Sequence, residues 1–258
     1  MRERTQRHRN VASESRVLRV RAGFSRRHEL PSFNRWTRRL ATRLDARLPS
    51  PVDVPDETRR RGELVNMYQI AEGILGGRGP RILQLMSATP GEGTSTVARE
   101  LARTVAEIIG RRVLLLKIAS LGTAGGGCCL DPVLGGDMPF KVVVSRAAAG
   151  SYMTAEIGAV KQSVFHLFDA QCIDNLFQQM LSLVEVVIID APPALTEFTG
   201  LVLARPVDGT ILVVEAERTR VPIVNRARRL IEANGGRILG VVLNKQRQYI
   251  PRLFNRWG

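Results

Sequence analysis

The chain has 258 residues with a hydrophobic content of 44%, enough for one globular domain of about 200 residues and an extension. It holds no run of about 18 apolar residues and no apolar core of a secretory signal, so we expect a cytoplasmic protein without a membrane-spanning helix. The formal net charge of +14 is concentrated before residue 62 and therefore characterises an N-terminal extension. The three cysteines, Cys128, Cys129 and Cys172, match no zinc-ligand spacing, and we expect reduced thiols.

Residues 1–61 contain 17 arginines, no lysine and seven acidic residues, a net charge of +10, whereas the rest of the chain carries +4. So polar a segment cannot bury enough surface to offset the entropy of ordering, and we expect a disordered tail and linker with one amphipathic helix at 36–48. Its charge would attract anionic lipid, phosphates or acidic proteins. The alternatives are a solvated arm without a dedicated partner and a mitochondrial transit peptide, which its acidic residues disfavour.

The predicted domain covers residues 62–258 and begins with a helix at 63–75, whose apolar residues recur at helical spacing up to a Gly-Gly pair. Short runs of Val, Ile and Leu then alternate with helical patterns. Such runs are typical of strands buried on both faces, so the pattern predicts an α/β fold with a doubly wound, mostly parallel sheet. The expected strands are 82–86, 113–116, 142–144, 186–189, 211–214 and 238–243, with a further short one at 164–168, and the expected helices are 95–109, 173–183 and 222–234.

The turn after the first of these strands reads Ser-Ala-Thr-Pro-Gly-Glu-Gly-Thr-Ser-Thr and leads directly into a helix. A glycine-rich turn between a strand and a helix directs backbone N–H groups at one point, which favours a bound anion. Compared with the P-loop pattern G-x-x-x-x-G-K-[ST], the segment retains Gly93 and Ser95 but has Ala88 at the first position and Thr94 in place of lysine. The alternative is a plain turn whose glycines serve steric needs.

A second motif is the apolar strand at 186–189 that ends in Asp190 and is followed by Ala-Pro-Pro. At the carboxyl edge of a parallel sheet, where such folds bind ligands, this carboxylate is placed to hold Mg²⁺. The alternative is a turn or helix-capping residue.

Several blocks of the sequence resemble the cytoplasmic domains of bacterial tyrosine kinases of capsule and exopolysaccharide synthesis, the CpsD/CapB-like P-loop family. That family is related to the Min/Par-type ATPases. The resemblance spans residues 62–258, and its blocks occur in the family's order: Pro-Gly-Glu-Gly at 90–93, Ser-Thr at 95–96, then 186–193, 207–214, 219–220 and 239–244. It implies a P-loop NTPase-like, three-layer, Rossmann-like architecture.

The resemblance also implies a site for ATP or ADP and for Mg²⁺. The loop contributes Gly91, Glu92, Gly93, Thr94, Ser95 and Thr96 to the nucleotide site, and Asn244 lies near the adenine. Ser95 and Asp190 are the implied Mg²⁺ ligands, and Asp190 is the implied catalytic carboxylate.

Three departures from the family pattern indicate impaired catalysis. The family has lysine at the position of Thr94 and aspartates at the positions of Lys117 and Ala119. Losing one charged phosphate contact costs about 1.5–3 kcal/mol, or roughly ten- to a hundred-fold in affinity, and losing an electrostatic stabiliser removes about a further 10²–10³ in rate. The final stretch also holds one tyrosine, Tyr249, in place of the family's cluster. The family's E-x-x-R-x-x-R oligomerisation motif is absent after Glu63, which puts homo-oligomerisation through that helix in doubt.

Lys117 suggests a compensating exchange. If its strand lies beside the strand before the loop, about 4.8 Å away, its ammonium could reach the phosphate site, restore the positive charge and reduce the need for Mg²⁺. The alternative is a surface lysine left by decay of the motif.

These observations predict a cytoplasmic accessory or regulatory protein of exopolysaccharide synthesis or export, a pseudo-kinase or pseudo-ATPase peripheral to the inner membrane. By the resemblance, its partner is a membrane-embedded polysaccharide co-polymerase or synthase. One alternative is an active ATPase or tyrosine autokinase that uses Ser95, Asp190 and a relocated lysine. Another is a Min/Par-type positional ATPase whose tail holds DNA or lipid, although we do not expect a nucleic-acid partner.

Overall fold

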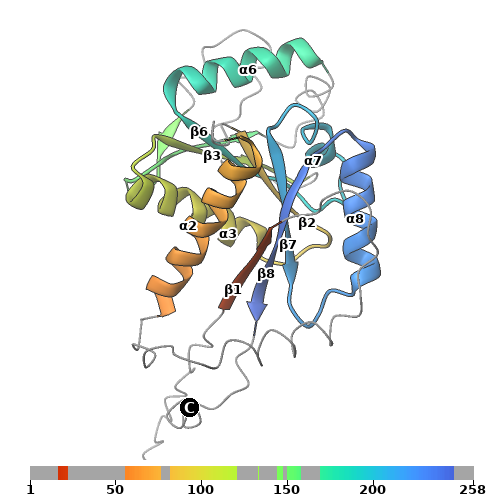
Figure 1. Cartoon of the computed structure of the whole chain (residues 1–258). Coiled ribbons are helices and arrows are strands. Elements are labelled where there is room, and N and C mark those ends of the chain that lie inside the picture. Colours follow the sequence, from red (N-terminus) through yellow and green to blue (C-terminus); the bar gives the residue numbers. More distant parts are fainter. Residues whose placement is uncertain are drawn as a thin grey trace, which may run out of the picture.

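A computed structural model describes residues 17–22, 56–76, 82–120, 133, 144–147, 150–157 and 169–246. They form an eight-stranded sheet in the order β1-β8-β7-β2-β6-β3-β5-β4 (Figure 1). The six strands from β8 to β5 are parallel, and the two edge strands, β1 and β4, run antiparallel to their neighbours. The strands are β1 Val17–Ala22, β2 Ile82–Ser87, β3 Val113–Ile118, β4 Ser145–Arg146, β5 Met153–Ile157, β6 Val186–Asp190, β7 Gly209–Glu215 and β8 Ile238–Gln246.

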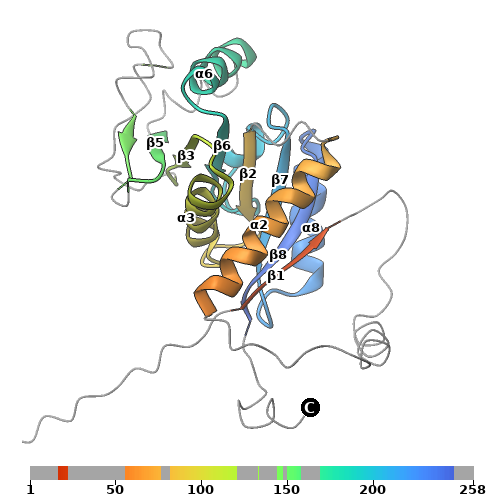
Figure 2. The same cartoon turned by 60° about the vertical axis from the view of Figure 1, so that its left-hand side comes forward.

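Helices cover both faces of this sheet, which gives three layers. Helices α2 (Asp56–Ile74) and α3 (Thr94–Thr104) pack with one face, and α3 continues into a π-helical turn at Val105–Ile109. Helices α6 (Ala170–Leu183), α7 (Thr199–Val202) and α8 (Val221–Ala233) pack with the other face. Figure 2 shows α2 and α3 together in front of the strands, with α8 behind. None of the described helices is long and apolar enough to span a bilayer.

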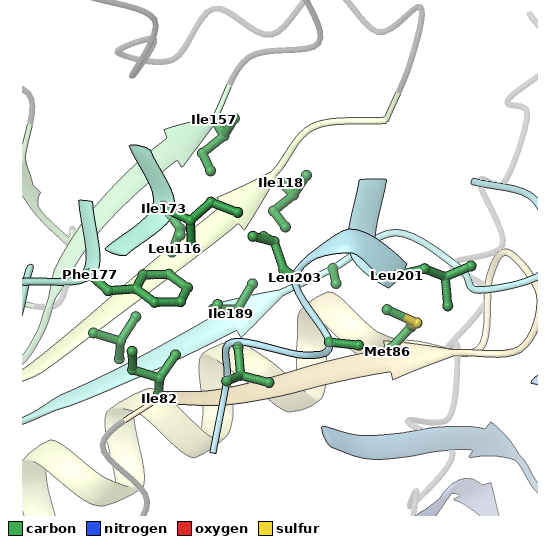
Figure 3. Close-up of a cluster of buried hydrophobic side chains, with 14 of the residues drawn as sticks. Ile82, Met86, Leu116, Ile118, Ile157, Ile173, Phe177, Ile189, Leu201 and Leu203 are labelled. Carbon is green, nitrogen blue, oxygen red and sulfur yellow. The ribbon is translucent and has the colours of Figure 1, made fainter. Parts of the chain in front are cut away.

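The larger hydrophobic cluster lies between the sheet and α6, α7 and α8. Figure 3 shows Phe177 and Ile173 of α6 beside Leu116 of β3 and Ile189 of β6. Every residue of β2 and of β6 is buried. This burial on both faces explains why the strands read as continuous apolar runs, and it confirms the predicted doubly wound α/β fold.

The predicted elements match the structure with a few differences. The first helix of the predicted domain begins at Asp56, before the predicted start at 63. Strand β5 was not predicted, because its half-buried alternating pattern lies between glycine-rich segments. Val144 precedes the short strand β4. The remaining residues of the strand expected at 142–144, the strand at 164–168 and the helix at 36–48 lie outside the described residues.

Strand β1 is an unexpected contribution from the arginine-rich segment. It pairs antiparallel with β8, with Val20 opposite Val242 and Ala22 opposite Gly240. Both views place it along the β8 edge of the sheet (Figures 1 and 2). Part of the segment predicted as tail and linker therefore belongs to the sheet.

Candidate functional site

The ends of five strands bring the predicted site residues to one edge of the sheet. Asp190 at the end of β6 is in register with Leu85 of β2 on one side and with Lys117 of β3 on the other. On the other side of β2, Glu215 of β7 is in register with Asn244 of β8. The loop after β2 thus lies at the middle of the sheet. Strands that follow β2 in the sequence lie on both sides of it, β7 on one side and β6 on the other. This is where open α/β sheets bind their ligands.

The backbone of the loop is shaped to receive an anion. Gly91 and Gly93 have φ angles of 84° and 91°, in the left-handed region that glycine adopts without strain. Helix α3 begins at Thr94 without a side-chain cap, and the carbonyl of Gly93 accepts the N–H groups of Thr96 and Val97 at 3.1 Å. Within the described part of the chain, the N–H groups from Gly91 to Ser95 donate to no protein acceptor. Uncapped N–H groups at a helix start favour a phosphate.

Gly93 is also required by a close approach of the last strand. A Cβ atom at this position would lie 2.2 Å from Nδ2 of Asn244. Nδ2 donates a hydrogen bond of 2.8 Å to the carbonyl of Glu92, and Oδ1 of Asn244 accepts the N–H of Lys245 at 2.9 Å. Asn244, predicted to lie near an adenine, therefore lies against the loop and supports it.

The side chain of Glu92 points into the protein and braces the loop. It is only 2% exposed. Its carboxylate accepts the N–H of Thr89 at 2.8 Å, the N–H of Glu215 at 3.4 Å and the hydroxyl of Thr219. The Glu92 carboxylate is thus engaged within the protein, and the role in nucleotide binding predicted for Glu92 would fall to its backbone N–H.

Three polar side chains lie where the loop meets the end of β6: those of Thr94, Ser95 and Asp190. The Thr94 hydroxyl oxygen is buried, and it has no hydrogen-bond partner among the described residues. Burial raises the pKa of the Asp190 carboxyl above its usual value, while the hydrogen bond from the Ser95 hydroxyl and the charges of Lys117 and Arg99 act in the opposite direction. A hydroxyl beside a carboxylate supplies hard oxygen donors, so Ser95 and Asp190 fit Mg²⁺, which typically takes one or two carboxylates, phosphate oxygens and waters.

The strand order corrects the reasoning about Lys117. Strand β6 lies between β2 and β3, so Lys117 is two strand spacings from the strand that precedes the loop, about 9.6 Å at 4.8 Å per strand. Its Nζ lies 3.2 Å from Oε1 of Glu156 in β5. The adjacency on which the exchange hypothesis depended is therefore wrong. Ala119 is buried just beyond β3.

Sequence reasoning missed Lys245. Its Nζ donates to the carbonyl of Gly91 at 2.5 Å and lies 3.0 Å from Oε2 of Glu215. Its position directly after Asn244, at the end of an apolar strand, was the only signal in the sequence, and that signal does not specify a contact with the loop.

Comparison with curated proteins identifies the relatives of this chain. Tyrosine-protein kinase CpsD of Streptococcus agalactiae serotype III is 25% identical over 177 residues, which cover 66% of this chain and 76% of the relative. Tyrosine-protein kinase YwqD of Bacillus subtilis is 25% identical over 169 residues, 63% of this chain and 71% of the relative. The chain is thus similar to the CpsD-like bacterial tyrosine-protein kinases. No family model matches it.

Solved structures share the fold of this CpsD-like chain. The kinase domain of Escherichia coli tyrosine kinase ETK matches with a TM-score of 0.66 and 19% identity, covering 84% of this chain and 89% of that domain. The chimerical protein CapA2B2 matches with a TM-score of 0.64 and 21% identity, over 76% of this chain and 87% of that one. The VpsO kinase domain has a TM-score of 0.60 and 23% identity, over 74% of this chain and 98% of that domain. The CpsD-like chain therefore has the P-loop kinase-domain fold that its sequence predicts.

Proposed function

We propose that this chain is a nucleotide-binding, catalytically impaired member of the CpsD-like family that regulates exopolysaccharide synthesis. The proposal depends mainly on one observation: among the residues that the structure describes, the backbone donors of the loop are unpaired and available to an anion, while a buried threonine occupies the position of the family's lysine. A phosphate bound there would accept N–H groups from Gly91 to Ser95, and the unpartnered Thr94 hydroxyl could donate to it. This supports binding more strongly than turnover.

The surroundings of Asp190 support the proposed impairment of catalysis. When bound, Mg²⁺ would neutralise phosphate charge, and Ser95 and Asp190 are the residues that would hold it. Among the described residues no cluster of three or more Asp, Glu, His or Cys could add further protein ligands. The strand beside Asp190 carries a lysine that is paired with Glu156. A phosphoryl group in transfer would therefore meet fewer stabilising charges than in an intact kinase.

The experiment is a calorimetric titration of the parent chain and of Thr94→Lys with ADP and ATP, with and without Mg²⁺. We expect the parent to bind ADP and the Thr94→Lys variant to bind about ten- to a hundred-fold more tightly, because it regains a charge-assisted phosphate contact. Thr94→Val is the matched control, since it removes the hydroxyl without adding charge. Failure of both the parent and Thr94→Lys to bind either nucleotide would contradict the proposal.

An active ATPase or tyrosine autokinase is the competing function, and the names of the relatives favour it. A radiolabelled-ATP assay separates the two functions. The proposal expects neither phosphate release nor phosphotyrosine above the background of the Asp190→Asn variant. Turnover by the parent that Asp190→Asn abolishes would establish the enzyme instead.

The proposed partner is an inner-membrane polysaccharide co-polymerase or synthase, with the chain held at the cytoplasmic surface of the membrane. Similarity to the CpsD-like tyrosine-protein kinases supports this, as does the arginine-rich N-terminal segment, which suits an anionic lipid surface. Cell fractionation with and without the co-polymerase provides the test. We expect the chain to leave the membrane fraction when the co-polymerase is deleted, and an unchanged distribution would contradict this partner.

A further inference from the structure

Lys245 is a cationic residue that connects the loop to a part of the chain far away in the sequence. Its Nζ bonds the carbonyl of Gly91, 154 residues earlier, and also lies 3.0 Å from the carboxylate of Glu215. Arg99 bonds a carbonyl in the same region, that of Ser95, but both belong to the first turns of α3, so this contact connects no second element. Lys245 therefore connects the loop, β7 and β8.

The local charges show why a cation is needed there. Glu92 places a buried carboxylate in the loop itself, and its three described hydrogen-bond donors are neutral. A polyphosphate on the loop would be repelled by this charge, and at Thr94 no side-chain cation offsets the repulsion. Burial acts to raise the pKa of Glu215, but the hydrogen bonds and charges of Lys245 and Arg218 hold it below its usual value. With Glu215 ionised and two cations beside it, the group carries one surplus positive charge next to the loop.

The backbone conformation at Lys245 indicates that the fold holds this residue in a specific position. Its φ angle of 59° lies in the left-handed region, which residues with a Cβ atom rarely adopt. Asn244 accepts the N–H of Lys245 and at the same time bonds the carbonyl of Glu92, so the two residues hold adjacent carbonyls of the loop. A strained residue held by several contacts is a feature of ligand-binding positions.

We infer that Lys245 is a positioning residue for phosphate binding. It holds the Gly91 carbonyl outward, which keeps the N–H groups of the loop directed at the anion, and its charge offsets that of Glu92. Lys245, which lies outside the loop, thus supplies part of the positive charge that the family's lysine would supply at the position of Thr94. This inference rests on the proposed nucleotide binding, and it assigns to the end of β8 a part in supporting the loop.

The test compares Lys245→Met with Arg218→Met as a matched control. Both variants remove one cation from Glu215, but Arg218 is 71% exposed and, within the described ranges, contacts the Glu215 carboxylate, whereas Lys245 is 25% exposed and also contacts the loop. In titrations with ADP and with inorganic tripolyphosphate, we expect Lys245→Met to weaken binding about tenfold and Arg218→Met to change it by less than about twofold. Lys245→Arg should restore affinity to within about threefold, and Lys245→Met should bind with a weaker dependence on salt.

Amide hydrogen exchange of Thr89, Thr96 and Val97, whose N–H groups are hydrogen-bonded to the loop, gives an independent readout in the ligand-free variants. We expect these amides to exchange about tenfold faster in Lys245→Met and at the parent rate in Arg218→Met, because only the first substitution releases the loop. Equal affinities in Lys245→Met and the parent, or equal losses in Lys245→Met and Arg218→Met, would overturn the inference. If the parent binds neither probe, the proposed function fails, while unchanged exchange in Lys245→Met would separately refute the positioning role.

Discussion

Gly93 combines two steric requirements at a single residue. Its φ angle lies in the left-handed region, and the Asn244 side chain occupies the space that a Cβ atom would fill. Gly91 shares the positive φ angle but has no heavy atom within 4 Å of an added Cβ, and Gly62 in the middle of α2 has neither constraint. Comparing alanine substitutions at the three glycines therefore distinguishes the cost of a positive φ angle from the cost of steric overlap with Asn244.

Alanine at these three positions should give graded changes in the free energy of unfolding. We expect Gly93→Ala to lose about 2–3 kcal/mol and Gly91→Ala about 1–2 kcal/mol, and we expect Gly62→Ala to gain about 0.5–1 kcal/mol because alanine favours the helix. Urea denaturation of each variant measures the effect. Equal losses for Gly93→Ala and Gly91→Ala would show that Asn244 moves aside without cost.

At the scale of an element, α2 docks on the sheet through a buried phenol. Tyr68 is almost fully buried among residues of α2, α3 and the strands. Burial, reinforced by the charge of Glu72 and a hydrogen bond to it, raises the pKa of Tyr68 to about 12. The folded state therefore retains the phenolic proton at a pH at which the unfolded chain, with a pKa near 10, has released it.

This difference predicts a stability loss at high pH. Because the folded state binds the proton more tightly, the free energy of unfolding should fall as the pH rises from about 10 to about 12, by at most about 1.4 kcal/mol per pH unit from this group. Tyr68→Phe removes the titrating hydroxyl but retains the ring, so its stability should fall less over the same range. Urea denaturation at a series of pH values compares the two proteins, and parallel curves would contradict the assignment to Tyr68.

At the scale of the whole molecule, β1 takes the edge position in place of β8, and the short β1 with its two arginines is a poorer template for pairing than the longer, apolar β8. An uncovered edge strand exposes unpaired N–H and C=O groups to other chains. We expect a chain lacking residues 1–22 to self-associate, measured by light scattering and size-exclusion chromatography. A chain lacking only residues 1–16 retains β1 and should behave as the parent does. Identical behaviour of the two truncations would show that β1 does not protect the edge.

Much of the fold could be predicted from the sequence because the central strands are buried on both faces and therefore appear as unbroken apolar runs. Strand β5 is only half buried, and its residues alternate in a short pattern beside glycine-rich segments. Strand β1 lies in a segment whose composition is dominated by arginine, and its pairing with β8 joins residues more than 200 positions apart. Such an edge depends on a distant partner, which a local pattern does not identify.

The site was predictable to the extent that its chemistry is local. The glycine-rich turn between a strand and a helix indicated the loop, and the apolar strand before Asp190 indicated the place of that carboxylate at the sheet edge. The Glu92 side chain was not predictable, because two of its hydrogen-bond partners, Glu215 and Thr219, follow more than 120 residues later. The adjacency assumed for Lys117 was wrong because chain order does not reveal that β6 is inserted between β2 and β3.

The contacts of the loop with β8 have a consequence for synthesis on the ribosome. The turn at 88–96 emerges early, whereas Asn244 and Lys245, which hold two of its carbonyls, follow those carbonyls by more than 150 residues. A nascent chain therefore carries the complete turn long before it carries the contacts that fix it. Competence to capture an anion should arise only after β8 has been translated, and a premature stop codon just before Asn244 should yield a product that retains the turn but has lost these two contacts.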